Sequence, residues 1–146
     1  THAARIVQRH GEPLAAPDGS LTHVFPTADA LAEADDDVLA MPERRKATLR
    51  GVSAAVRDGV VDLDAGADRE RTRRNLLALP GIGTWTVEYV AMRALGDPDA
   101  FPAGDLGVRH GLRALGVEAD AREAERRSQA WRPFRAYTVL HLWGAH

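Results

Sequence analysis

The sequence contains no cysteine, and Lys46 is the single lysine among its 19 basic residues. Without cysteine the chain forms no disulfide, no thiolate metal site and no cysteine-ligated iron-sulfur cluster. A single lysine severely limits chemistry that proceeds through a Schiff base. These absences exclude several cofactors and disfavour a lysine nucleophile.

Long apolar runs and a strong charge imbalance are also missing. No run approaches the ~18 residues that a membrane-spanning helix requires, so we expect a soluble protein. The net charge of -2 does not indicate a nucleic-acid binder. Net charge governs only the far field, however, and a local patch can still bind phosphate. At 146 residues the chain is long enough for one core, so we expect a single domain over residues 1–146.

The residues that are frequent favour helices. Alanine, leucine, glutamate and arginine recur, β-branched runs are short, and no stretch alternates apolar and polar residues for long. The pattern predicts an all-α domain of helices joined by Gly/Pro loops. Residues 12–26 carry enough proline, glycine and aspartate to be an irregular crossing loop. Thr27 and Asp105 are predicted to cap the helices that follow them.

Residues 79–87, LPGIGTWTV, are the most informative stretch. They predict a helix that ends at Leu79, a tight turn up to Gly83, and a second helix from Thr84. The glycines permit positive φ and remove the Cβ that would keep a partner at a distance. Backbone amides at such a turn and helix start attract an anion, so a phosphate fits. From spacing alone, an ordinary helix corner with Ile82 in the core is equally favoured.

The stretch LPGIGTWTVEYVAMRALGDPDAFPAGDLGVRHGL resembles the hairpin, Gly/Pro-rich loop and aspartate of the helix-hairpin-helix DNA glycosylase superfamily. The GIG-x-WT-xx-Y run, Arg93 and the terminal WRPFRAYTVLHLW are most similar to the bacterial DNA-3-methyladenine glycosylase II branch. A hairpin alone is weakly specific, because many DNA-binding proteins contain one. The hairpin, loop, aspartate and C-terminal tryptophan in this order are a much stronger combination.

The resemblance runs from ARIVQRHGEPL to the end of the sequence. It implies an N-terminally truncated, C-terminal portion of a helix-hairpin-helix glycosylase domain, with the helix-hairpin-helix at about residues 68–95. In the family, further helices and an α/β domain precede this region. The resemblance also implies a cytoplasmic, nucleoid-associated bacterial protein.

Asp105 matches the catalytic aspartate of the family. Hydrolysis of an N-glycosidic bond passes through an oxocarbenium-like sugar, so a carboxylate can stabilise the positive charge and orient or deprotonate the attacking water. Without the resemblance, a simple helix cap is the favoured interpretation. The two roles are compatible, because a helix N-terminus keeps a carboxylate ionised.

Three aromatic residues, Trp85, Tyr89 and Trp143, match positions that line the family's base pocket. An enzyme that acts on a base takes it out of the stack and holds it against aromatic faces. An alkylated, cationic base gains a cation-π attraction of about 0.5–2 kcal/mol there. By spacing alone these aromatics would be core residues, an interpretation that we keep for Trp131. Bifunctional members use lysine where this chain has Trp85, so the resemblance implies a hydrolase without a lyase step.

The hairpin is implied to bind one DNA phosphate through Gly81, Ile82, Gly83 and Thr84. The resemblance also implies a structural monovalent cation there, bound by the backbone carbonyls of Leu77, Leu79 and Ile82. No cofactor is expected to be required. Four arginines on the preceding helix are weaker candidates for DNA contacts, because a charge run is usually a solvated face: Arg69, Arg71, Arg73 and Arg74.

The sequence therefore predicts a monofunctional glycosylase that hydrolyses the N-glycosidic bond of 3-methyladenine-like bases in base excision repair. Its expected partner is double-stranded DNA with a flipped damaged base, and we expect a monomer that does not bind membranes. Three alternatives stay open. They are a glycosylase for oxidised or mismatched bases, a non-catalytic helix-hairpin-helix DNA-binding module, and a structural helical domain without a nucleic-acid role.

Overall fold

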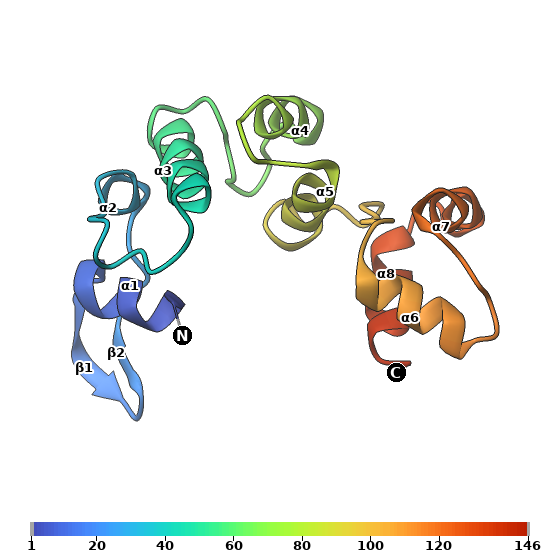
Figure 1. Ribbon diagram of the computed structural model, residues 1–146, viewed down its shortest axis with the longest axis horizontal. Helices are drawn as coiled ribbons and strands as arrows, with labels where there is room; N and C mark the ends of the chain where they lie inside the picture. The colour runs from blue at the N-terminus through green and yellow to red at the C-terminus, as the bar shows by residue number, and fades with distance from the viewer. Residues whose placement is uncertain (1, 146) are drawn as a thin grey trace. The chain divides into compact units, whose positions relative to one another are not determined.

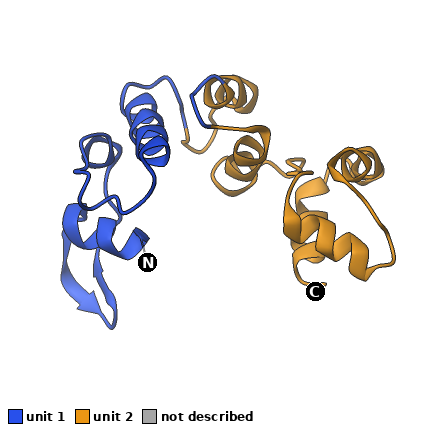
Figure 2. Ribbon diagram, in the orientation of Figure 1, with its two compact units in different colours: residues 1–62, 78–81 blue, residues 63–77, 82–146 orange. Residues whose placement is uncertain are grey.

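The computed structural model describes residues 2–145, and these form eight α-helices, one short 3-10 helix and one β-hairpin (Figure 1). The chain divides into two compact units (Figure 2). The first unit runs to Asp62 and includes residues 78–81, and the second contains residues 63–77 and the chain from Ile82 onward. The expectation of one domain over residues 1–146 stays a prediction. No helix in residues 2–145 is long and apolar enough to cross a membrane.

The first unit packs three helices around a small apolar core. Its elements are α1 (His2–His10), β1 (Pro13–Asp18), β2 (Leu21–His23), α2 (Ala28–Ala32) and α3 (Glu43–Arg57). The predicted cap of α2 is confirmed, because Thr27 Oγ1 accepts a hydrogen bond from the Ala30 amide at 3.2 Å. The core contains Ile6, Leu31, Ala34, Val38 and Leu39, with Met41 and Leu49 packed against it.

Strands β1 and β2 correct one prediction, because they lie where the sequence predicted an irregular loop. The two strands pair antiparallel, with Pro13 opposite His23 and Asp18 opposite Leu21. Gly19 and Ser20 form the two-residue turn between the strands. Gly19 adopts a φ of 56°, and a glycine with positive φ at the first position of such a turn is typical of hairpins. The strands are almost fully exposed, so they show no apolar alternation that could reveal them. The helical architecture is confirmed, with this hairpin as the exception.

The second unit contains the remaining helices. They are α4 (Arg69–Leu77), α5 (Thr84–Arg93), α6 (Leu106–Ala114), α7 (Ala121–Ser128), the 3-10 helix η1 (Gln129–Trp131) and α8 (Arg135–Trp143). The start of α5 is confirmed at Thr84. Helix α4 ends at Leu77, two residues before the predicted Leu79. Pro80 disfavours helical backbone at the residue before it, which explains the earlier end.

Two apolar clusters hold the second unit together. The larger contains Phe101, Val108, Leu112, Ala124, Val139 and Leu142, and the other contains Ala91, Leu95 and Ala100. Trp131 packs on the larger cluster, with its ring edge-to-face against Phe101 at 6.0 Å between centroids. This placement agrees with the prediction that Trp131 is a core residue. The larger cluster joins α6, α7 and α8 to the loop that precedes α6.

Helices α6 and α8 approach each other at Gly111. A Cβ at this position would lie 2.7 Å from the carbonyl carbon of Leu142 and would overlap its oxygen. Backbone atoms cannot give way as a flexible side chain can, so glycine is required at this contact. The close approach holds the last turn of α8 against α6, and from there the Trp143 side chain reaches Asp105 at the start of α6.

We predict that Gly111→Ala lowers the free energy of unfolding by about 1–3 kcal/mol, because the added methyl group overpacks the contact with α8. Urea unfolding of the variant and the wild type measures this difference. Gly104→Ala is the matched control, because a Cβ there meets no atom within 4 Å. Equal midpoints for Gly111→Ala and the wild type would contradict the close approach of the two helices.

Candidate active site

Asp105 caps helix α6, as the sequence predicts. Its backbone is extended, and its Oδ1 accepts a hydrogen bond from the Val108 amide at 3.0 Å. The loop between α5 and α6 carries it to this position. The side chain is half-buried, so the carboxylate is held at the helix start while part of it stays accessible.

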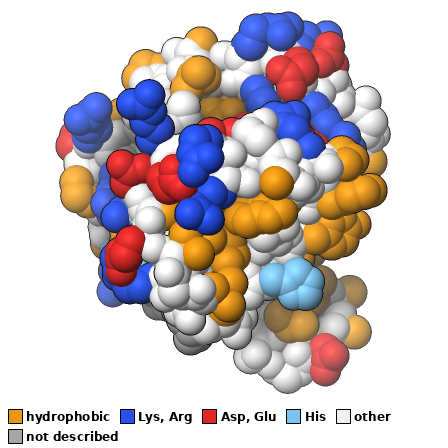
Figure 3. Space-filling view, turned by 90° about the vertical axis from the view of Figure 1, so that its right-hand side faces the viewer, with side chains coloured by type: hydrophobic (Ala, Val, Ile, Leu, Met, Phe, Trp, Pro, Cys, Tyr) orange, Lys and Arg blue, Asp and Glu red, His pale blue; other side chains and the backbone are white. Residues whose placement is uncertain are grey.

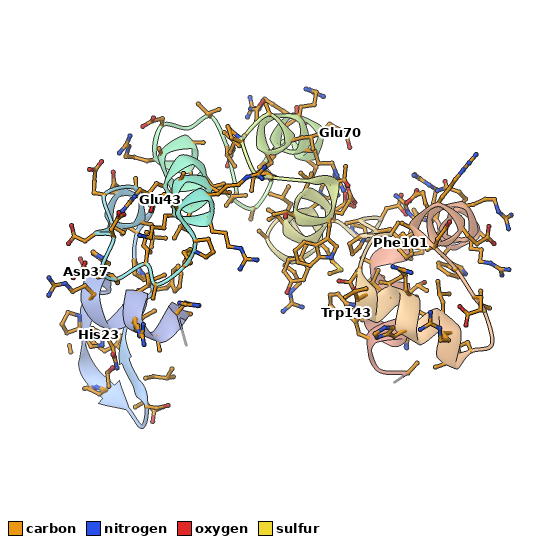
Figure 4. All side chains as sticks on the ribbon, in the orientation of Figure 1. His23, Asp37, Glu43, Glu70, Phe101 and Trp143 are labelled. Atoms are coloured by element: carbon orange, nitrogen blue, oxygen red, sulfur yellow. The ribbon has the colours of Figure 1, made fainter. Side chains whose placement is uncertain are left out.

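Two tryptophans donate hydrogen bonds to this carboxylate. Trp85 Nε1 lies 2.8 Å from Oδ2, and Trp143 Nε1 lies 2.8 Å from Oδ1. Trp85 is on the first turn of α5, and Trp143 is at the C-terminal end of α8, where Figure 4 labels it. The sequence predicted both rings as walls of a base pocket but gave no sign that they hold Asp105.

The pKa of Asp105 is lowered from its ordinary value. Burial alone raises the pKa of a carboxyl group, and it is the largest influence here. The hydrogen bonds from Trp143, Trp85 and the amides of Val108 and Gly107 outweigh it together, because they stabilise the charged form. Asp105 is therefore a carboxylate at neutral pH and a weak base.

The three predicted pocket aromatics form one cluster beside the carboxylate. Trp85 and Tyr89 are stacked, with centroids 5.3 Å apart and planes at 23°. Tyr89 and Trp143 are tilted by 39° at 6.2 Å. Trp85 is 44% exposed, whereas Trp143 is partly buried. An accessible indole next to an ionised carboxylate suits a planar, cationic ring.

Gly107 also belongs to this arrangement, although the sequence analysis did not select it. A Cβ at Gly107 would lie 2.7 Å from Trp143 Cδ1 and 3.0 Å from Asp105 Oδ1. Only glycine therefore lets the indole reach the carboxylate. A glycine inside the first turn of a predicted helix, where it is unfavourable, is the signal that could have revealed it.

The predicted phosphate-binding turn has the required donors. Gly81 has a φ of 88°, and Gly83 is the N-cap of α5 without a side-chain cap. The turn at residues 80–81 lies directly before the start of α5. The first amides of a helix have no partner within the helix and can bind an anion. Phosphate binding by these residues stays a prediction.

In the first unit, Gly81 has a second structural role that the sequence did not reveal. The Thr48 hydroxyl on α3 donates to the carbonyl oxygens of Arg44 and Pro80, at 3.0 and 3.2 Å. A Cβ at Gly81 would overlap Thr48 Oγ1. The absent side chain therefore lets the turn dock on α3, and no local pattern around Thr48 indicates this contact.

The predicted cation ligands fit carbonyl coordination in their donor chemistry. Leu77 is the last residue of α4, and Leu79 and Ile82 follow it. Each backbone carbonyl oxygen has two lone pairs, so one that accepts a single hydrogen bond can still bind a cation. The cation itself stays a prediction.

The arginines before the hairpin differ in their availability. Arg73 forms ion pairs with Glu88 and Asp97, and Arg69 donates to the Gly96 carbonyl at 3.3 Å. On the face shown in Figure 3, Lys and Arg side chains are interspersed with Asp and Glu. The structure therefore gives no support to Arg73 as a DNA contact, and the hypothesis stays a prediction for Arg69, Arg71 and Arg74.

Comparisons with known proteins identify relatives of this chain in sequence and in fold. No family model matches the chain. It is 49% identical, over 98% of its length, to the Mycobacterium tuberculosis probable bifunctional transcriptional activator/DNA repair enzyme AlkA. It is 33% identical, over 96% of its length, to the Escherichia coli DNA-3-methyladenine glycosylase 2. The chain spans 29% of the first protein and 49% of the second.

Two solved structures share the fold. The 3-methyladenine DNA glycosylase of Archaeoglobus fulgidus is 25% identical, with a TM-score of 0.76 over 97% of this chain and 50% of that one. The Schizosaccharomyces pombe 3-methyladenine DNA glycosylase, solved with abasic DNA, is 24% identical. Its TM-score is 0.73 over 86% of this chain and 65% of that one.

By its likeness in sequence and fold to these proteins, the chain belongs to the helix-hairpin-helix DNA glycosylase superfamily. Within this superfamily its sequence is of the DNA-3-methyladenine glycosylase II type.

We predict that Trp143→Phe raises the pKa of Asp105, because phenylalanine keeps a ring but removes the N–H donor. NMR titration of the Asp105 carboxyl carbon measures the change. Asp105 has a lowered pKa in the folded state, so its contribution to stability is present above its ordinary pKa and is lost as the pH falls through the folded value. Tyr89→Phe is the control and should leave the titration unchanged; an unchanged pKa in Trp143→Phe would disprove the stabilising role of the indole.

We predict that Gly81→Ala destabilises the protein by about 1–2 kcal/mol from the left-handed backbone alone, with a further penalty from the overlap with Thr48. Thermal unfolding followed by circular dichroism gives the comparison. Gly51→Ala on α3 is the control, because its Cβ meets no atom and alanine is favoured inside a helix. If both variants melt alike, the docking of the turn on α3 is not as described.

Proposed function

We propose that this chain is the catalytic portion of a monofunctional DNA glycosylase, which hydrolyses the N-glycosidic bond of 3-methyladenine-like bases in base excision repair. The observation that carries the proposal is the Asp105 carboxylate, which accepts hydrogen bonds from Trp85 and Trp143 beside an exposed aromatic surface. The two relatives in sequence are described as a DNA repair enzyme and a DNA-3-methyladenine glycosylase.

The site supplies stacking surfaces and one ionised carboxylate. Alkylation at a ring nitrogen makes a purine cationic, so it stacks favourably on an electron-rich indole and leaves readily. As the glycosidic bond breaks, positive charge develops on the sugar, and Asp105 stabilises it electrostatically. Each carboxylate oxygen already accepts a hydrogen bond from an indole N–H, which reduces its basicity. Its main role is therefore to stabilise charge and orient water rather than to remove a proton.

The lysine content supports hydrolysis without a lyase step. The resemblance to the family implies that Trp85 stands where bifunctional members have their catalytic lysine. Lys46, the single lysine of the sequence, lies on α3, where its Nζ is 3.3 Å from Glu43 and 3.5 Å from Asp36. A lysine that is held as a charged partner is a poor nucleophile, because only the neutral amine forms a Schiff base.

The proposed partner is duplex DNA with the damaged base flipped out. The amides of Gly81, Ile82, Gly83 and Thr84 would bind one phosphate. A monovalent cation held by the carbonyls of Leu77, Leu79 and Ile82 would supply positive charge for that phosphate. The protein would act as a monomer in the bacterial cytoplasm.

The decisive variant is Asp105→Asn, which keeps a good helix cap but removes the charge. We expect release of methylated bases from duplex DNA to fall by about 10²-fold or more, with DNA affinity retained. The assay uses the natural protein at its full length, treats duplex DNA with a methylating agent, and measures free base in single-turnover experiments.

Asp120→Asn is the matched control, because Asp120 caps α7 in the same way, with Oδ1 2.8 Å from the Glu123 amide. It should release base at the wild-type rate. Wild-type activity in Asp105→Asn would refute the proposed mechanism. Faster release of neutral lesions than of cationic ones would instead favour a glycosylase for oxidised or mismatched bases, and binding without release a non-catalytic module.

A further inference from the structure

The loop between α5 and α6 is fixed at several points before it reaches Asp105. The Pro98 carbonyl accepts from the Ala136 amide at 2.9 Å, and Asp99 forms ion pairs with Arg132 and Arg135, both at 2.8 Å. At the start of the loop, Asp97 forms an ion pair with Arg73 of α4. The position of Asp105 is therefore set by contacts that lie up to eight residues before it.

Arg73 on α4 is the centre of these contacts. Its Nε lies 2.9 Å from Glu88 Oε1, and its Nη2 lies 2.6 Å from Asp97 Oδ2. The Arg73 and Asp97 side chains are only 16% and 11% exposed, so solvent screens this ion pair less than it screens surface pairs. A single guanidinium thus joins α4, α5 and the loop.

Glu88 connects the same network to the candidate site. Its Oε2 accepts a hydrogen bond from the Phe101 amide at 3.0 Å, so the carboxylate holds the loop directly. Glu88 is also one helical turn after Trp85, which donates to Asp105. The separation between Trp85 and Asp105 consequently depends on how Arg73 and Glu88 hold the loop against α5.

The cleft around this network has its charges already paired. It has a volume of about 530 Å³, lies in the second unit and is bordered by Trp85. Asp105, Tyr89 and Trp143 do not line it. In its wall, Arg73 binds the carboxylates of Glu70, Glu88 and Asp97 at 2.6–3.5 Å, and Arg135 binds those of Asp99 and Glu125 at 2.8–3.1 Å. The charged side chains that line the cleft therefore stabilise the loop, and the cleft is not a second binding pocket.

We propose that Arg73 is a positioning residue, which sets the hydrogen bond between Trp85 and Asp105 by bridging Glu88 to Asp97, and that it does not contact DNA. Without the guanidinium, Glu88 loses its arginine partner, and Asp97 keeps the longer contact with Arg69, at 3.9 Å between Nη1 and Oδ1, so the two partly buried carboxylates repel each other. They would move apart and carry the loop, with Asp105, away from α5. The effect on base release rests on the proposed function, whereas the effect on the indole does not.

Three variants test this proposal in the natural protein at full length: Arg73→Met, Arg73→Lys and the control Arg126→Met. Arg126 pairs with Glu123 on the exposed surface of α7, so its loss removes an arginine without touching the loop. The readouts are the indole N–H signals of Trp85 and Trp143 in ¹H–¹⁵N NMR spectra, the single-turnover rate of base release, and the DNA dissociation constant at several salt concentrations.

We expect Arg73→Met to shift the Trp85 indole signal and to reduce the single-turnover rate by about 10²-fold, as misplacement by about 1 Å can do. The DNA dissociation constant and its salt dependence should stay at wild-type values. Arg73→Lys keeps the charge but cannot bridge both carboxylates with the same geometry, so it should show smaller changes in both readouts. Arg126→Met should leave every readout unchanged.

Unchanged indole signals with an unchanged rate would overturn the proposal and leave Arg73 with a purely stabilising role. Weaker DNA binding with a salt slope reduced by about 1 would make Arg73 a phosphate contact instead. If Arg73→Met does not fold, Arg73→Lys decides by the same readouts. If the wild type releases no base, the proposed function fails, while the shift of the Trp85 signal still tests the positioning role.

Discussion

The hydrogen bonds from two indoles to one carboxylate are the interaction on which the second unit depends. They require the start of α5, the start of α6 and the end of α8 to meet within 2.8 Å contacts at Asp105. Two glycines make this meeting sterically possible. Gly111 lets the backbone of α8 approach α6, and Gly107 leaves room for the Trp143 ring. The packing of the three helices and the chemistry of the site therefore both depend on the close approach that these two glycines allow.

Contacts between residues close together in the sequence could be predicted, whereas contacts between residues far apart in the sequence could not. The caps at Thr27 and Asp105 bond to amides three residues away, so local rules found them. The partners of Asp105 are 20 and 38 residues away, and Arg73 reaches Asp97 across 24 residues. Periodicity and spacing carry no information on such pairs. The resemblance brought Trp85 and Trp143 to one pocket, but it did not reveal that both donate to the carboxylate.

The aromatic residues illustrate why spacing could not separate core from site. Trp131 and Trp85 both lie in helical segments, so by spacing alone both fit a core position. In the structure, Trp131 packs on Phe101 as part of the larger apolar cluster. Trp85 is 44% exposed, and its indole N–H donates a hydrogen bond to the Asp105 carboxylate. What distinguishes them is the polar partner of the indole, which comes from a distant part of the chain. The role of Gly81 also depends on a distant residue. The sequence predicted a role in phosphate binding, and the close contact with Thr48 adds a structural requirement for glycine at this position.

Under the proposed function, a chain with a net charge of -2 has to recognise DNA without an excess of positive charge. The basic side chains of the loop network, Arg73 and Arg135, are neutralised by carboxylates and contribute little field outside the molecule. A broad basic surface is then not what would attract the phosphate. The alternative is a set of neutral amides at the start of α5, oriented by a turn that Gly81 allows. Such donors act at short range. Binding of the phosphate would therefore depend on the positions of these amides rather than on an excess of positive charge.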